Sequence, residues 1–296
     1  MRHAVYRPRV LYREIRPRPE LADVVHCLWT LEGFASSDAV AQPVLPDGRP
    51  EIILHLGDPF DRVEFDGRRE RQPRVMYAGQ LQRRLLLRPA GRVAVLGIRF
   101  HAHGASALLH IPQYELIGNP TALDSLNGRL TRALERVWDC GDLSQAAAIA
   151  ESVILRSVDR SRMDARLAGV VALIRNTRGR LSVDALARAS HLTRRHLERL
   201  FLQDVGLTPK RLARITRFQR ALRSLECGES SRRGTDTAAA CGYADQSHFI
   251  RDFRLLAGCS PGEHLLRQGE LTKFFVTGGQ EIGKDLLISC LPPWIS

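Results

Sequence analysis

The first hundred residues alternate short apolar runs with turn-forming residues. The runs cover residues 24–31, 51–56, 62–65, 75–78, 85–87 and 93–100. They are separated by Pro46-Asp47-Gly48, Asp66-Gly67 and Pro89-Ala90-Gly91, where proline presets one backbone angle and glycine tolerates a positive one. Several short strands at this spacing predict a small β-barrel or β-sandwich.

From residue 103 onward the apolar positions recur at helical spacing. This pattern predicts a short helix at 105–110 and longer amphipathic helices at 126–138 and 143–158. The polar stretch 156–163 is interpreted as a hinge between domains. The predicted fold is therefore α+β, with an N-terminal barrel or sandwich flanked by helices and an all-α C-terminal domain. The predicted boundaries are 1–158, 159–267, and a loosely ordered tail at 268–296.

The C-terminal domain contains an internal duplication. The stretch LTRRHLERLFLQDVGLTP (192–209) aligns with ADQSHFIRDFRLLAGCSP (244–261) at a displacement of 52 positions. Under this alignment Phe201 meets Phe253, Gly206 meets Gly258, and Thr208-Pro209 meets Ser260-Pro261. Upstream, at a displacement of 51, His191 meets Gly242. Each copy reads as helix, tight turn, helix, and we place the two units at about 182–203 and 234–256.

In each unit the second helix has one apolar face and one polar face. In the first unit Thr193 is the expected N-cap, His191 turns the chain with a positive φ, and Leu197, Leu200 and Phe201 point inward. Arg195, Glu198 and Arg199 share the opposite face at i, i+3, i+4 spacing. In the second unit Asp245 is the expected cap and Phe249 and Phe253 point inward. The outward residues there are Gln246, Ser247, His248 and Arg251. Two arginines able to form bidentate contacts with guanine suit a helix that reads the major groove.

An uninterrupted amphipathic helix is predicted between the two units, over residues 210–225. A rigid helix would hold the two recognition helices at a fixed separation. If both enter successive major grooves on one DNA face, that separation is roughly 34 Å. The pattern therefore predicts a bipartite site on double-stranded DNA.

Charge is concentrated in the same domain. Residues 161–269 carry 20 Lys and Arg against 10 Asp and Glu, whereas the rest of the chain carries 24 against 22. A surplus of arginine favours a phosphate backbone as partner. The chain has no apolar run of the ~18 residues that a membrane span needs, and no secretory signal is visible, so we expect a cytoplasmic protein without a membrane partner.

These residues resemble the AraC/XylS family of bacterial transcriptional regulators, whose signature is two helix-turn-helix units joined by a long helix. The run GYADQSHFIRDFRLLAGCSP (242–261) is closest to that signature. The resemblance implies contacts with bases or with the DNA backbone for ten residues. Base contacts are implied for Arg195, Glu198, Arg199, Gln246, Ser247, His248 and Arg251, and backbone contacts for Thr193, Arg194 and Asp245.

The same resemblance implies control of transcription initiation, more often activation, with RNA polymerase as a partner. The run LPDGRPEIILHLGDP (45–59) resembles, more weakly, the sensor domain of some members, which implies a small-molecule effector and self-association as a homodimer. The chain departs from the family at Gly234, Thr235 and Thr237, where members carry bulky aliphatic residues. Their low helix propensity predicts a second unit of low stability.

Other functions fit the sequence less well. An enzyme in the N-terminal domain could use His101, His103, His55 and Glu51 as metal ligands, but their spacing gives no convincing third ligand, and packing or surface roles are favoured. GxSxG, P-loop and strand-linked GxGxxG motifs are absent, so we expect no catalytic residues, metal or cofactor. A DNA-repair protein would need a zinc-binding cysteine cluster. The six cysteines are scattered and are interpreted as buried small hydrophobic residues. A non-specific architectural protein would need charge but no paired reading helices.

Overall fold

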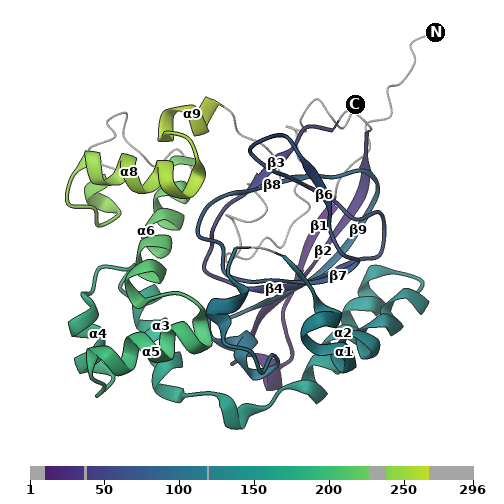
Figure 1. The fold of residues 1–296 in the computed structure, drawn as a ribbon, viewed down its shortest axis with the longest axis horizontal. Coiled ribbons are helices and arrows are strands. Elements are labelled where there is room, and N and C mark those ends of the chain that lie inside the picture. Colours follow the sequence, from purple (N-terminus) through teal and green to yellow (C-terminus); the bar gives the residue numbers. More distant parts are fainter. Residues whose placement is uncertain (1–10, 37–38, 119, 227–237, 267–296) are drawn as a thin grey trace.

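The chain folds into a β-rich domain and a helical domain that lie side by side (Figure 1). The computed structural model describes residues 11–36, 39–118, 120–226 and 238–266. The predicted α+β class is confirmed. The predicted tail at 268–296 and the family departures Gly234, Thr235 and Thr237 lie outside the described residues.

Two antiparallel sheets build the N-terminal domain. The larger sheet has the order β1 (Leu11–Ile15), β2 (Val25–Ala35), β9 (Gly91–Phe100), β4 (Glu51–His55), β7 (Val75–Ala78) and β10 (Thr121–Ala122). The smaller sheet has the order β3 (Gln42–Val44), β8 (Leu85–Arg88), β5 (Asp61–Val63) and β6 (Arg69–Arg71). All six predicted apolar runs form strands. The four strands that the pattern missed, β1, β3, β6 and β10, are the four sheet edges, where short and partly solvated strands need no apolar run.

The residues of the larger sheet alternate between two environments, as the pleat requires. On β2, Leu28 points to the core that the sheet shares with α1 (Leu123–Leu134) and α2 (Leu143–Ser157). Its neighbours Trp29 and Leu31 point the other way, to a core shared with Leu87 of the smaller sheet. The two sheets therefore face each other across a second apolar layer.

A closed barrel, one of the two predicted alternatives, is wrong. Among the described residues the strands of the two sheets pair only within their own sheet. Barrel closure requires hydrogen bonding all around the ring of strands. The smaller sheet, with strands of three or four residues, instead covers one face of the larger sheet.

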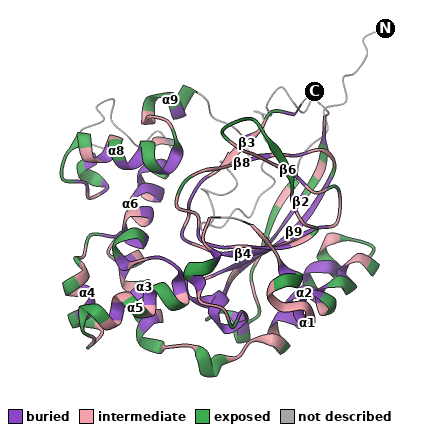
Figure 2. Cartoon of the chain, viewed as in Figure 1, coloured by how far each residue is buried: buried purple, intermediate pink, exposed green. Residues whose placement is uncertain are grey.

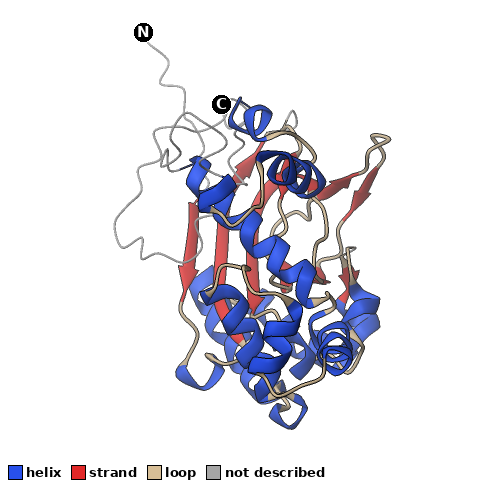
Figure 3. Ribbon diagram, turned by 90° about the vertical axis from the view of Figure 1, so that its left-hand side faces the viewer, coloured by secondary structure: helices blue, strands red, loops and turns tan. Residues whose placement is uncertain are grey.

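The helical domain contains α3 (Ala165–Asn176), α4 (Val183–Ala189), α5 (Arg194–Val205), α6 (Pro209–Glu226), α8 (Gln246–Ala257) and α9 (Pro261–Leu266). Figure 3 looks onto these helices, with the strands of the larger sheet behind them. Buried residues of α3, α4, α5, α6 and α8 form one hydrophobic core, seen as buried positions along α6 in Figure 2. Leu45 and Ala102 of the N-terminal domain belong to the same core, so the two domains are packed together.

Candidate nucleic-acid interface

The first helix-turn-helix unit comprises α4 and α5. The turn between them contains His191 at φ 54°, the positive value that the sequence predicts. The Thr193 hydroxyl accepts a hydrogen bond from the His196 backbone N–H at 3.2 Å, so the predicted N-cap is confirmed. Gly206 ends α5 at φ 83° in the left-handed region. These local signals set the angle at which α5 leaves the turn.

The second unit repeats this geometry at the aligned positions. Gly242 has φ 84° in the turn, where the first unit has His191. The Asp245 carboxylate accepts from the His248 backbone N–H at 2.7 Å, which confirms the second predicted cap. Gly258 ends α8 at φ 71°. Residues 238–240 immediately before this turn are helical. The duplication seen in the sequence is therefore a duplication of backbone geometry.

The structure agrees largely with the predicted buried and exposed faces of α5 and α8. Leu197, Phe201, Phe249 and Phe253 are all at most 2% exposed, whereas Leu200 is half-buried instead of buried. The residues predicted to contact DNA lie on the other side of the same helices or at their caps. Thr193, Arg194, Arg195, Arg199, Asp245, Gln246, Ser247 and Arg251 are exposed, and Glu198 and His248 are intermediate.

One of the exposed arginines of the first unit forms ion pairs within that unit. Arg194 Nε lies 3.1 Å from a Glu198 carboxylate oxygen, and Arg194 Nη1 lies 3.5 Å from Asp184 on α4. The hydrogen bond that Arg194 donates to Glu198 and the charge of Asp184 raise the pKa of Arg194. Arg194 thus links the two helices of the unit, while Arg195 and Arg199 extend from the exposed face of α5.

The second unit contains a buried carboxylate that sequence reasoning missed. Asp252 on α8 is 3% exposed and lies 3.3 Å from Arg214 Nε on α6 and 3.5 Å from His248 Nε2. The His248 ring also meets Tyr243 edge-on at 5.4 Å. Asp252 therefore holds a predicted DNA-contacting side chain in place. A charged residue beside Phe253, at i+3 from Phe249, was the available signal, because that spacing places it toward the buried face.

Helix α6 joins the two units by direct contacts. Arg217 Nη1 donates to the Gly179 carbonyl at 2.6 Å, in the loop before α4, and its guanidinium lies 5.5 Å from the centre of the Tyr243 ring. Phe218 meets Phe253 edge-on at 5.2 Å. Because polar and apolar contacts from one helix reach both units, their separation is set by α6.

The four candidate metal ligands named from the sequence form no common site in the described part of the chain. Within the described residues, no group of three His, Cys, Asp or Glu side chains is placed to hold a metal ion. Glu51 is hydrogen-bonded to Arg99 and Trp29, and His55 contacts Gln72. Of the cysteines, Cys27 and Cys241 are buried as predicted, Cys140 and Cys259 are half-buried, and Cys227 and Cys290 lie outside the described residues. No helix in the described part of the chain is long and apolar enough to cross a membrane.

Two known families match separate parts of the chain. A helix-turn-helix domain family matches residues 186–267, and a domain of unknown function (DUF6597) matches residues 13–121. Over 172 residues the chain is 32% identical to the HTH-type transcriptional activator RhaS of Escherichia fergusonii, covering 54% of this chain and 59% of that protein. RhaS of Escherichia coli strain SE11 is 38% identical over 86 residues, 29% of this chain and 30% of that protein. The chain thus spans less than two thirds of the length of these relatives.

Two solved structures are also similar. An AraC-type transcriptional regulator from Chromobacterium violaceum is 29% identical, with a TM-score of 0.32, over 35% of this chain and 95% of that chain. ToxT from Vibrio cholerae is 12% identical, with a TM-score of 0.43, over 81% of this chain and 98% of that chain.

Proposed function

Since the chain belongs to the AraC/XylS family through its C-terminal helix-turn-helix domain, we propose that it is a sequence-specific DNA-binding regulator of transcription. The observation that carries the proposal is the repeated helix-turn-helix geometry, with two exposed polar faces held on one linking helix. A second helix of this kind inserts its N-terminal residues into the major groove. Arginine at these positions pairs with guanine through two hydrogen bonds, and glutamate accepts from cytosine.

We assign direct base contacts to the exposed faces of α5 and α8. In α5 these are Arg195, Glu198 and Arg199, and in α8 they are Gln246, Ser247, His248 and Arg251. Thr193, Arg194 and Asp245 lie at the helix starts and approach the DNA backbone. The arginine surplus of the domain supplies the attraction to phosphates.

The test is selection of bound sequences from a random pool of duplex DNA with the full-length chain. The expected product is a site with two half-sites whose centres lie about 10 base pairs apart. Inserting about 5 base pairs between the half-sites would turn them to opposite faces of the duplex and should abolish the contribution of one unit. Equal binding at both spacings would contradict a rigid link through α6.

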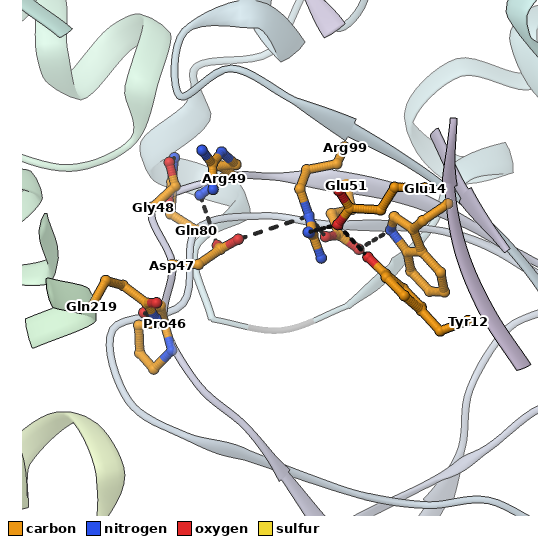
Figure 4. A network of polar contacts seen from close by, with 11 residues as sticks. Tyr12, Glu14, Pro46, Asp47, Gly48, Arg49, Glu51, Gln80, Arg99 and Gln219 are labelled. Carbon is orange, nitrogen blue, oxygen red and sulfur yellow. Dashed lines mark hydrogen bonds and ion pairs between the residues drawn. The ribbon is translucent and has the colours of Figure 1, made fainter. Parts of the chain in front are cut away.

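The contact between the domains supports effector-responsive regulation. The turn 45–49 packs on α6, where Gln219 Nε2 donates to the Pro46 carbonyl at 2.6 Å (Figure 4). Gly48 has φ 75°, and a Cβ there would lie 2.8 Å from a Leu212 methyl group. The same turn supplies Asp47 to the wall of a cavity between the two sheets. A molecule in that cavity would therefore touch the segment that holds the linking helix.

The chain offers a matched control for this coupling. Asp47 and Asp66 each begin an Asp-Gly-Arg turn, and each carboxylate accepts from the backbone N–H two residues later at 2.9 Å. Asp47 also lies 3.8 Å from the buried Arg99. We expect Asp47→Ala to change DNA affinity by about fivefold, the lower end of usual coupling energies, and Asp66→Ala to leave it unchanged. Equal effects of the two substitutions would refute coupling through this turn.

Activation is the favoured direction of control, because the relative RhaS is described as a transcriptional activator. Activation implies contact with RNA polymerase, and the sensor-like domain implies a homodimer. Transcription from the selected site with purified polymerase tests the first, with a rise in transcript as the expected result. Light scattering of the purified chain tests the second, and a monomer at micromolar concentration would contradict it.

A further inference from the structure

The facing sheets enclose a cavity of about 70 Å³ whose wall is mainly apolar. Its principal apolar residues are Trp29, Leu31, Ile53, Phe60, Met76 and Val95. All of them except Met76, which lies on β7, belong to the apolar layer between the two sheets. Preformed pockets of this kind, apolar with a few placed polar groups, are typical of small-molecule sites.

One end of the cavity carries an uncharged polar pair. His55 is 1% exposed and Gln72 is 5% exposed, and both line the cavity. His55 Nε2 lies 3.2 Å from Gln72 Oε1. Because an amide oxygen only accepts, Nε2 carries the proton and Nδ1 is left as an acceptor. Among the described residues neither His55 Nδ1 nor Gln72 Nε2 has a hydrogen-bond partner. The pair thus presents one acceptor and one donor.

Buried polar groups without partners are costly, about 1–3 kcal/mol each, and are few in native proteins. Two such polar groups without partners, on neighbouring side chains in the wall of one cavity, indicate a bound group that forms hydrogen bonds with both. Burial lowers the pKa of His55 to about 4, so the ring is neutral near pH 7. The missing partner therefore meets an uncharged ring and an uncharged amide.

The charged residues of the cavity wall, Asp47, Arg49 and Glu51, form one network with the buried Arg99, in which two carboxylates offset two guanidinium groups. Arg99 Nε lies 2.5 Å from a Glu51 carboxylate oxygen (Figure 4). The second Glu51 oxygen accepts from Trp29 Nε1 at 3.2 Å. Asp47 lies 3.8 Å from Arg99 Nε. An ion entering the cavity would bring an additional charge to a network whose charges already offset one another, which is unfavourable in a buried site.

We propose that this cavity binds a neutral, mainly apolar molecule with one hydroxyl group, which donates to His55 Nδ1 and accepts from Gln72 Nε2. The volume is about half of the ~150 Å³ cavity that accommodates benzene, so the molecule is small or the cavity widens around it. The meaning of this binding for transcription rests on the proposed function, whereas the binding itself does not.

The test uses four probes that share one five-membered ring: cyclopentanol, cyclopentane, cyclopentanecarboxylate and cyclopentylamine. Binding to the full-length chain without DNA is measured by NMR titration at pH 7. Cyclopentanol should bind about tenfold more tightly than each of the other three, because only it satisfies both polar groups without adding charge. Preference for the carboxylate or the ammonium, or absence of binding by all four, would overturn the proposal and leave buried water as the occupant.

The double substitution His55→Leu and Gln72→Leu tests the polar pair. It should reduce cyclopentanol affinity about tenfold and remove the preference over cyclopentane, a ratio that a loss of overall stability does not produce. Gln145→Leu, a substitution at an exposed position of α2, is the matched control and should keep the preference. An alcohol preference that survives the double substitution would refute the assigned contacts. Cyclopentanol binding without any change in DNA affinity would leave the site standing and contradict only its regulatory role.

Discussion

Asp252→Asn should weaken DNA binding by the second helix-turn-helix unit and leave binding by the first unit unchanged. Asp252 is nearly fully buried, and its carboxylate joins α8 to α6 through an ion pair with Arg214 at 3.3 Å. It also contacts His248 Nε2, on its own helix, at 3.5 Å. Asparagine keeps the shape of the side chain but removes the charge that both partners face. The substitution therefore tests the electrostatic contribution with little change in packing.

The size of the effect follows from the exposure of the three side chains. Hydrogen bonds to charged groups contribute about 1.5–3 kcal/mol, and solvent-exposed ion pairs about 0.2–1 kcal/mol. The side chains of Arg214 and His248 are 32% and 37% exposed, so water screens part of each interaction. We expect the free energy of unfolding to fall by about 1–2 kcal/mol, between those two limits.

Two assays separate stability from recognition. Urea denaturation of the full-length chain measures the free energy of unfolding. DNA binding is then compared on duplexes in which one or the other half-site is scrambled. Asp252→Asn should lower affinity about 5- to 30-fold where the second half-site is intact, the factor that corresponds to 1–2 kcal/mol. Binding that depends on the first half-site alone should change little.

Arg251→Ala is the matched control, since Arg251 is the exposed neighbour on the same helix. It should relax base preference in the second half-site without lowering the free energy of unfolding. If Asp252→Asn weakens both half-sites equally, or if it leaves stability unchanged, Asp252 does not position α8 and the reasoning fails.

Three further predictions concern other parts of the molecule. Arg195→Ala should weaken DNA binding at the selected site by about 1–3 kcal/mol and relax the base preference at one or two positions. Arg194→Ala should instead weaken binding to all sequences alike. Identical effects of the two substitutions in a binding selection would contradict base contacts by α5. Gly97→Ala should destabilise the fold by about 1–3 kcal/mol and shift tryptophan fluorescence, because a Cβ there would lie 2.0 Å from the Trp29 ring; an unchanged denaturation midpoint would refute that contact. Burial lowers the pKa of His103 to about 4, so this ring binds a proton more readily in the unfolded chain than in the folded one. His103 should therefore contribute a loss of about 1.4 kcal/mol of stability per unit as the pH falls from 6.5 to 4, and His103→Gln should remove that contribution in pH-dependent denaturation.

Much of each helix-turn-helix unit could be predicted from the sequence, because the residues that cap its helices and form its turn act on nearby backbone groups. Thr193 and Asp245 cap helices through backbone groups three residues away, and His191 and Gly242 turn the chain within a single residue. Such contacts involve neighbours in the chain, so residue type and spacing suffice to find them. The duplication strengthened each signal, since the same arrangement appeared twice at a nearly constant displacement.

Among the strands, only the central ones could be predicted from local sequence signals. The six runs that were predicted lie inside the sheets, where apolar residues are needed for burial. The four edge strands were missed because pairing on one side with exposure on the other leaves no apolar run to detect. Closure of the barrel depends on whether those edges pair, and that question has no local signal.

The contacts that link the two domains were decided by the tertiary structure alone. Gln219 and Pro46 are 173 residues apart in the chain, and their hydrogen bond exists because the turn at 45–49 packs on α6. The partners of Asp252, and the cavity beside His55 and Gln72, arise in the same way from elements that meet only in the folded chain. Helix caps and apolar periods are local and can be read along one segment, whereas burial of a polar group is a property of everything that surrounds it.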